Sequence, residues 1–319
     1  MKQTVVLALG GNALSRAGEA GTHAEQQANA VAMAEAVCAL LNGGRGVVLV
    51  HGNGPQVGAL ALQQEQGAGL VAAQPLHALG AMTQGQLGSL LTLALRNACG
   101  ERAARAVALV THVLVDPADP GFAHPTKPIG PFFAPARARA LAAGRGWAVG
   151  EDAGRGWRRL VASPEPLAIV EADAIRSLAA AGFLVVAAGG GGIPVQRVDG
   201  RLQGVDAVVD KDLAAALLAL STGADAMLLV TGVDQVALDY GTERERPIGT
   251  ITAEEAEGHL LAGQFPPGSM GPKVAAAVRF LRGGGKLAVI TSPSHLATAL
   301  DGRGGTRIVP ARAWAGAGR

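Results

Sequence analysis

Short apolar runs that end in glycine-rich turns recur along the whole chain, and most are followed by a segment of helical length. Continuous apolar runs are typical of strands that are buried on both faces of a parallel sheet. The pattern predicts an α/β fold: a mostly parallel central sheet covered by helices. The predicted strands are 3–9, 46–51, 107–115, 183–188, 226–231, 286–291 and 306–309. The predicted helices are 24–42, 81–99, 171–181, 207–221 and 271–283.

Residues 116–150 interrupt this alternation. The segment DPADPGFAHPTKPIGPFF contains too many prolines for a core strand or helix, and the Arg/Ala-rich segment after it is typical of an exposed helix. We interpret 116–150 as a protruding subdomain. A change of composition within 151–200 divides one domain, 1–319, into halves of about 1–180 and about 181–319, and we expect each half to hold one substrate.

Composition and charge exclude several classes of protein. The net charge of +2 is spread along the chain without basic runs, whereas nucleic-acid binding needs a concentrated basic surface. No apolar run approaches the roughly 18 residues of a membrane span, and the N-terminal apolar run predicts a strand, not a signal peptide. Cys38 and Cys99 lie in apolar helical segments, which favours buried thiols over a disulfide. We therefore expect a soluble, cytoplasmic protein.

Two glycine clusters directly follow predicted strands: Gly10-Gly11-Asn12 and Gly52-Asn53-Gly54. Glycines let the backbone approach a ligand closely, and a helix N-terminus after such a turn attracts anions. A third turn, in VVAAGGGGIPV, is expected at the same sheet edge. Tight turns without a ligand remain the alternative for each cluster alone. Neither cluster matches G-x-G-x-x-G or G-x-x-x-x-G-K-[ST], which disfavours a dehydrogenase and a Walker-type ATPase.

Lysine is rare in this chain, because 22 of the 27 basic residues are Arg. Lys127, Lys211 and Lys273 nevertheless occur in turns or at predicted helix starts. Lys211 stands between Asp210 and Asp212, where the helix dipole disfavours a cation, so a bound anion explains it better than capping does. Lys273 follows a Gly-Pro turn that opens a helix. An exposed surface lysine stays open as the alternative for each, most of all for Lys127 between its prolines.

Other catalytic chemistries lack their motifs. The sequence has no G-x-S-x-G elbow and no His or Cys pair at metal-ligand spacing. His51 is the one histidine inside a glycine turn, and we expect it to orient that turn.

These segments together resemble the carbamate kinases of the amino acid kinase superfamily, over nearly the whole chain. The resemblance runs through LALGGNAL, HGNGPQVG, AMTQG, VDPADPGF, HPTKPIGPFF, EDAGRGWRR, ASPEP, AAGGGGIPV, VDAVVDKDLA, LLVTGVD, DYGTERER and GSMGPKVAAAVRFL. It implies a three-layer αβα fold, a homodimer, Mg²⁺ with ATP or ADP in the C-terminal half, and carbamoyl phosphate or carbamate in the N-terminal half. The magnesium is held mainly by the nucleotide phosphates.

The resemblance also implies roles for single residues. Lys211 and Lys273 contact the transferring phosphoryl group, Asp212 holds both lysines, and Lys127 of the subdomain contacts the acceptor. The acceptor side further includes Gly10, Gly11, Asn12, Gly52, Asn53 and Gly54. The nucleotide side includes Asp210, Thr231, Asp234, Tyr240, Met270 and Gly271.

The implied reaction converts carbamoyl phosphate and ADP into ATP and carbamate, which decays to ammonia and CO₂, as in arginine metabolism. A carbamate acceptor is already an anion, so no general base is required. The sequence departs from the family pattern at Ala59, at Gly88-Ser89 and around 74–80. Two alternatives therefore stay open: a kinase of the same fold for another small carboxylate or phosphonate, and a catalytically weak sensor of nucleotide or carbamoyl phosphate.

Overall fold

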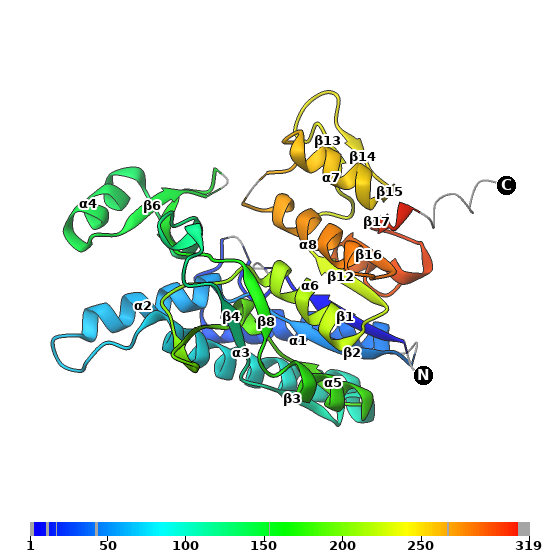
Figure 1. The fold of residues 1–319 in the computed structure, drawn as a ribbon, viewed down its shortest axis with the longest axis horizontal. Helices are drawn as coiled ribbons and strands as arrows, with labels where there is room; N and C mark the ends of the chain where they lie inside the picture. The colour runs from blue at the N-terminus through cyan, green and yellow to red at the C-terminus, as the bar shows by residue number, and fades with distance from the viewer. Residues whose placement is uncertain are drawn as a thin grey trace.

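A computed structural model describes residues 3–10, 13–16, 18–41, 44–152, 154–266 and 268–311. Within these residues the centre of the fold is an eight-stranded sheet in the order β15-β17-β16-β12-β1-β2-β9-β3 (Figure 1). Neighbouring strands are parallel except for β16 and β17. The strands are β1 (Thr4–Ala8), β2 (Gly46–Val50), β3 (Ala106–Ala108), β9 (Leu184–Val186), β12 (Ala226–Val230), β15 (Thr250–Thr252), β16 (Leu287–Thr291) and β17 (Thr306–Val309).

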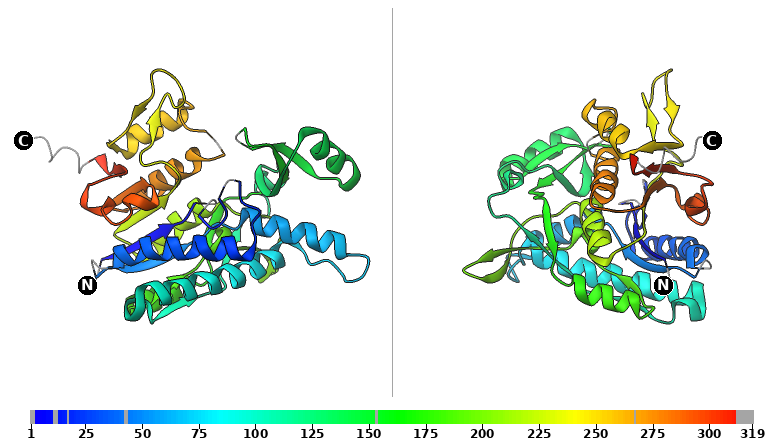
Figure 2. Two further views of the ribbon diagram at one scale, coloured as in Figure 1. Left: turned by 180° about the vertical axis from the view of Figure 1, so that it is seen from behind. Right: turned by 45° about the vertical axis from the view of Figure 1, so that its right-hand side comes forward.

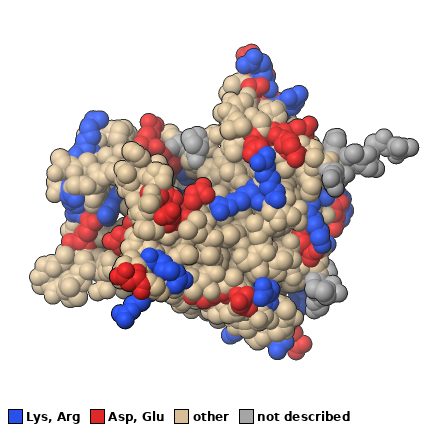
Figure 3. Space-filling model, in the orientation of Figure 1, with Lys and Arg blue, Asp and Glu red and all other residues tan. Residues whose placement is uncertain are grey.

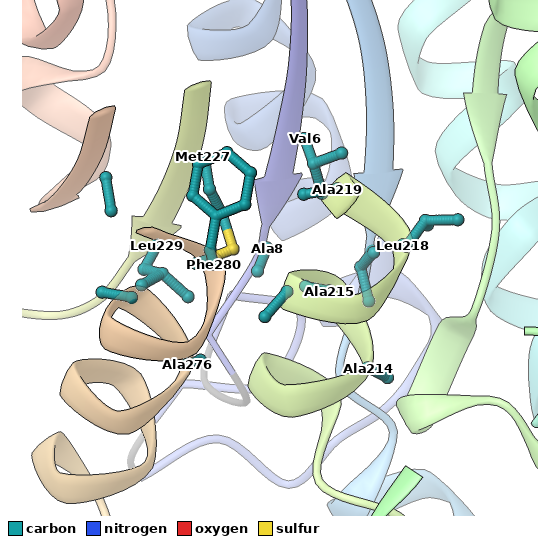
Figure 4. Packing of buried hydrophobic residues seen from close by; sticks show 14 of the residues in the cluster. Val6, Ala8, Ala214, Ala215, Leu218, Ala219, Met227, Leu229, Ala276 and Phe280 are labelled. Atoms are coloured by element: carbon teal, nitrogen blue, oxygen red, sulfur yellow. The ribbon is translucent and has the colours of Figure 1, made fainter. Parts of the chain in front are cut away.

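Helices cover both faces of this sheet, which confirms the three-layer αβα prediction. Alternate side chains of a strand point to opposite faces. Val6 and Ala8 of β1 accordingly pack with helices α5, α6 and α8, as Figure 4 shows for α6 and α8, whereas Val5 and Leu7 pack with α1 and α3. The helices are α1 (His23–Leu41), α3 (Leu76–Cys99), α5 (Ala172–Ala180), α6 (Lys211–Thr222), α7 (Ala253–Leu261) and α8 (Met270–Arg282).

Three smaller sheets surround this body. One has the order β11-β10-β4-β8, one is the pair β13-β14, and one has the order β5-β7-β6 and carries helix α4. We call β5, α4, β6 and β7 the small subdomain, and Figures 1 and 2 show it projecting from the body. The remaining elements are α2 (Gly54–Gly67), β4 (His112–Val115), β5 (Lys127–Phe133), α4 (Pro135–Arg145), β6 (Ala148–Glu151), β7 (Trp157–Val161), β8 (Pro166–Ile169), β10 (Ile193–Val198), β11 (Arg201–Gly204), β13 (Ala237–Leu238) and β14 (Arg246–Pro247).

The predicted protruding segment corresponds to this small subdomain. The expected exposed helix is α4, and only the end of the proline-rich segment, Lys127–Phe133, forms β5 at the edge of a small sheet, so that the subdomain begins later than the predicted 116. An edge strand tolerates proline because one of its sides has no ladder partner. The small subdomain continues through β7 to Val161, beyond the predicted limit of 150.

The single strand predicted at 107–115 is wrong, because the segment forms two strands in two sheets. β3 lies at the edge of the main sheet, and β4 belongs to the sheet with β8, β10 and β11. Between them, the side chain of Gln84 on α3 accepts a hydrogen bond from Thr111 N (2.8 Å) and donates one to Thr111 O (3.1 Å). These two bonds satisfy the backbone where the chain leaves one sheet for the next.

Helix α2 was not among the predicted helices, and Gly58 lies in its interior. Glycine lowers the helix propensity of a segment. In the structure Gly58 packs directly against β5 of the small subdomain, and a Cβ at Gly58 would lie 2.0 Å from Gly130 N. The residue that weakens the local helix signal is therefore required by tertiary packing.

The prediction of two free thiols is also wrong. Cys38 on α1 and Cys99 on α3 form a disulfide, with their Cα atoms 5.3 Å apart. Both segments are apolar and helical as predicted, but the two helices pack side by side on the same face of the sheet. Because this pairing depends on which helices are neighbours, the local sequence pattern could not indicate it.

Acidic and basic side chains are interspersed over the face of the molecule shown in Figure 3. Among the helices of the described residues, none is both long enough and apolar enough to span a bilayer.

Candidate active site

A cavity of about 740 Å³ opens where the parallel strands of the main sheet end. The carboxyl ends of β12, β1, β2 and β9 lie next to one another in the sheet, so the turns after these strands meet at one edge. Gly10, Gly52, Gly190 and Thr231 of these turns line the cavity. The prediction that the three glycine-rich turns share one edge is therefore confirmed.

Two of these glycines leave no room for a side chain. A Cβ at Gly10 would lie 2.8 Å from the carbonyl oxygen of Val230 on the neighbouring strand, and a Cβ at Gly190 would lie 2.2 Å from the Asn53 amide nitrogen. Glycine therefore lets the turn after β1 approach the end of β12, and the turn after β9 approach the turn after β2. Gly11 and Asn12, predicted in the same turn as Gly10, lie outside the described residues.

Helix α2 points its N-terminus into the cavity, because Gly54, its first residue, is part of the wall. Asn53 precedes the helix but does not cap it with its side chain. Its amide instead donates to Thr83 Oγ1 (2.9 Å) on α3, a bond that is buried. The dipole of α2 favours an anion at this end of the helix.

His51 supports the glycine turn after β2, as the sequence predicts. Its ring is fully buried, Nδ1 donates to the carbonyl of Gly52 (3.0 Å), and Gly189 packs against the ring. Burial lowers the pKa of His51 from 6.5 to about 4, although the bond to Gly52 opposes the shift. The imidazole is therefore neutral at pH 7, which is consistent with a structural role.

This buried imidazole predicts an acid-sensitive fold. Between pH 6.5 and 4 the unfolded chain protonates this histidine while the folded chain does not, so stability falls as the pH falls. We expect His51 to contribute a loss of about 2 kcal/mol in the free energy of unfolding between pH 7 and pH 5. Urea unfolding at pH 7 and pH 5 measures this loss. The free energy of unfolding of His51→Asn should fall by about 2 kcal/mol less than that of the wild type over the same interval. Equal losses in both proteins would contradict the prediction.

Helix α6 begins inside the cavity, at Lys211. Asp210 caps it: its Oδ1 accepts from the backbone N–H of Asp212 (2.8 Å) and of Leu213 (3.3 Å). The other oxygen of Asp210 accepts from Lys127 Nζ (2.5 Å), which reaches across from β5 of the small subdomain. Although burial favours the neutral acid, Lys127 and Lys211 hold the pKa of Asp210 well below its usual range. This ion pair joins the small subdomain to the body.

One carboxylate oxygen holds two lysines at the centre of the site. Asp212 Oδ2 accepts from Lys211 Nζ and from Lys273 Nζ, each at 2.9 Å, and Asp212 and Lys273 are buried. Lys273 comes from the first turn of α8, so the N-terminal turns of two helices converge on this carboxylate. The second oxygen, Oδ1, is buried and has no partner among the described residues.

The protonation of this triad follows from its geometry. Burial opposes the charge on Lys211, but the carboxylates of Asp212 and Asp210 outweigh it and raise its pKa. Burial lowers the pKa of Lys273. The carboxylate of Asp212 opposes this shift, and the positive charge of Lys211 adds to it. Burial also opposes the charge on Asp212, yet the two lysines lower its pKa overall. Two lysines thus meet one carboxylate in the cavity wall, an excess of basic groups that suits a phosphate.

A second cluster lines the cavity on the side of the small subdomain. Arg158 on β7 donates from Nε to Gly130 O (2.9 Å) and from Nη1 to Asp152 Oδ2 (3.0 Å). Arg155 donates to the other oxygen of the same carboxylate (3.0 Å). Two guanidinium groups thus share one carboxylate in the cavity wall.

Comparison with known proteins identifies the family. The sequence matches the model of the Amino acid kinase family over residues 3–292. It is 45% identical to the carbamate kinase of Pyrococcus horikoshii, over 97% of this chain and 100% of that protein. The chain belongs to the amino acid kinase family. The fold agrees with carbamate kinase from Giardia lamblia bound to citric acid, with a TM-score of 0.93 and 43% identity over 97% of this chain and 99% of that one. The same Giardia enzyme bound to AMP-PNP has a TM-score of 0.87, again at 43% identity and with the same coverage.

The cavity of this amino acid kinase brings together most of the predicted site residues. They are Lys127, Lys211, Asp212, Lys273, Gly10, Gly52, Asn53, Gly54, Asp210 and Thr231. Met270 and Gly271 start α8 beside the cavity without lining it. Asp234 pairs with His295 (3.1 Å), and Tyr240 is 63% exposed. The substrate, nucleotide and catalytic roles of all these residues stay predictions.

Sequence reasoning missed Arg158, Arg155 and Asp152 as wall residues. The rarity of lysine does not point to these three residues, because an arginine is not unusual in an arginine-rich chain. The one available signal was the segment EDAGRGWRR, which contains all three and forms part of the resemblance.

Proposed function

We propose that this protein is a carbamate kinase, which transfers a phosphoryl group reversibly between carbamoyl phosphate and ADP. The observation that carries the proposal is the pair of lysine ammonium groups on Asp212 Oδ2, in a cavity that also receives the N-terminus of α2. Together these groups stabilise negative charge at one place. The likeness to carbamate kinases over the full chain supports carbamate as the acceptor.

Phosphoryl transfer requires mainly alignment and positive charge around the oxygens of the phosphoryl group. In the proposed reaction a terminal oxygen of ADP attacks phosphorus, and the bond from phosphorus to the carbamoyl oxygen breaks. Carbamate leaves as an anion, so no proton has to move. Lys211 and Lys273 neutralise the phosphoryl oxygens as they pass between the two substrates, and Asp212 keeps both ammonium groups at this position.

We assign the acceptor to the half at about 1–180 and the nucleotide to the half at about 181–319. Gly52, Asn53 and Gly54 at the start of α2 supply backbone donors for the carbamoyl phosphate. Lys127, placed by β5, faces the same cavity from the small subdomain. Its ion pair with Asp210 supports a role in which the subdomain closes over the substrate.

The nucleotide is proposed to enter as its magnesium complex, and the metal neutralises phosphate charge during transfer. Asp210 and Asp212 are carboxylates of the cavity wall, and both are paired with lysines. Among the described residues, no group of three or more His, Cys, Asp or Glu side chains could hold a metal ion. We propose that the nucleotide phosphates carry the magnesium, as the resemblance implies. AMP-PNP in the Giardia lamblia relative supports ATP and ADP as the nucleotides.

A homodimer and a place in arginine metabolism remain predictions from the resemblance, and a cytoplasmic location remains a prediction from the sequence composition. The expected free thiols no longer support the cytoplasmic location, because the two cysteines are paired.

A coupled assay tests the function directly. Purified protein supplied with Mg²⁺, ADP and carbamoyl phosphate should form ATP, and it should do so with a higher kcat/KM than with acetyl phosphate. Efficient ATP formation from another acyl phosphate alone would indicate a different acceptor. A folded protein that forms no ATP from carbamoyl phosphate or any other acyl phosphate would contradict the proposal. That result would favour a sensor of nucleotide or carbamoyl phosphate.

A further inference from the structure

Arg158, whose guanidinium lies 5.0 Å from the centre of the Phe132 ring, carries a buried N–H group without a hydrogen-bond acceptor among the described residues. The residue is 7% exposed, and its Nε and Nη1 are bonded to Gly130 O and Asp152. The remaining nitrogen, Nη2, is buried and has no hydrogen-bond partner among the described residues. A buried N–H group without an acceptor is costly, and more so when it is charged. Such a group in a cavity wall indicates an acceptor that arrives with a ligand.

The charge around Arg158 also favours an anion. Asp152 is the carboxylate bonded to Arg158, and it is shared with Arg155, so two positive charges face one negative charge. Burial lowers the pKa of the Arg158 guanidinium, although the bond and charge of Asp152 oppose this shift. A ligand with a negative oxygen would balance the excess charge.

The position of Nη2 indicates which part of the ligand it meets. A Cβ at Gly54 would lie 3.8 Å from Nη2, so the guanidinium lies against the first residue of α2. The dipole of α2 and the guanidinium therefore act on the same small region. Lys211 and Lys273 belong to a separate group, held by Asp212 at the starts of α6 and α8.

We propose that Arg158 Nη2 donates to an oxygen of the carboxyl-type end of the acceptor, the carbamate or the carbamoyl end of carbamoyl phosphate. This inference rests on the proposed function. The planar guanidinium suits a planar carboxylate, whereas the compact ammonium groups of the two lysines suit a moving phosphoryl group. Arg158 thus determines specificity for a carboxylate acceptor. Its bond to Gly130 O, on the neighbouring strand β5, fixes the guanidinium within the small subdomain.

The test compares Arg158→Met and Arg158→Lys with the wild type in the ATP-forming assay. A charge-assisted hydrogen bond is worth about 1.5–3 kcal/mol, so we expect the KM for carbamoyl phosphate to rise roughly 10- to 100-fold in both variants. The KM for ADP should change less than about 3-fold, as should the inhibition constant of inorganic phosphate. Arg159→Met is the matched control, because Arg159 is the next residue of β7, pairs with Glu65 and is not part of the cavity wall. The control should keep the wild-type KM for carbamoyl phosphate.

Thermal unfolding first establishes which variants are folded. If Arg158→Met does not fold, Arg158→Lys decides, because it keeps the charge and the aliphatic stem. An unchanged KM for carbamoyl phosphate in the folded variants would overturn the inference. A parallel rise in the inhibition constant of phosphate would also overturn it, because Arg158 would then contact the phosphoryl end. A wild-type protein that forms no ATP would overturn the proposed function and this inference with it, whereas an active wild type with unaffected variants would overturn the inference alone.

Discussion

Replacing Lys211 or Lys273 by alanine is expected to lower kcat at least about 100-fold, the usual cost of removing one preorganised transition-state donor. Each lysine places an ammonium group in the cavity through its bond to Asp212, at 2.9 Å. The charge matters most while the phosphoryl group is between its two partners, so kcat should fall far more than the KM for either substrate rises. Steady-state kinetics of ATP formation measures both constants.

A matched control for these variants is Lys286→Ala. Lys286 also pairs with an aspartate, Asp225, but its side chain is 75% exposed and lies away from the cavity wall. Its kcat should equal that of the wild type. Near-normal turnover in both Lys211→Ala and Lys273→Ala would contradict the proposed mechanism.

Replacing Asp212 by asparagine is expected to lower kcat by a similar factor, on the order of 100-fold, because both ammonium groups lose their common anionic partner. It should also change the pH dependence. The carboxylate raises the pKa of Lys211 and opposes the lowering of the pKa of Lys273 by burial. Without it both pKa values fall, so the lysines lose their protons, and the enzyme its activity, at a lower pH than in the wild type. The pH profile of kcat measures this shift.

Asp225→Asn is the control for this change, because it removes an aspartate that pairs with a lysine outside the cavity. It should leave the alkaline limb of the profile in place. The interpretation of Asp212 would fail if Asp212→Asn kept both its turnover and the wild-type alkaline limb.

The apolar runs predicted the middle of the main sheet well. β1, β2, β9, β12 and β16 lie where the sequence places strands, because a strand buried on both faces leaves a continuous apolar segment. Helices α6 and α8, which carry Lys211 and Lys273 in their first turns, were also predicted. Their observed first and last residues differ from the predicted ones by a few positions. The prediction of one strand at 107–115 was wrong because no local signal marks its interruption at Thr111. There the side chain of Gln84 on α3 forms hydrogen bonds with the Thr111 backbone.

The candidate site was predictable where its residues break a local rule. Lys211 stands against the helix dipole, and Gly10 and Gly54 follow strands in turns that expose backbone donors. Arg158 breaks no local rule, since β7 accepts an arginine and the chain is rich in arginine. Only the burial of Nη2 without a partner distinguishes it from the other arginines of the segment.

By itself, the sequence determined which segments form buried strands, where their turns approach a ligand and which lysines are unusual. No local pattern indicated that Lys273 reaches the carboxylate of Asp212, which only the resemblance implied, and the tertiary structure alone decided that Cys38 and Cys99 are paired. The physical reason is that turns and strands depend on neighbours along the chain, whereas Lys273 and Asp212, like Cys38 and Cys99, lie 61 positions apart. Their distances are set by how the helices pack on the sheet, which no local pattern records.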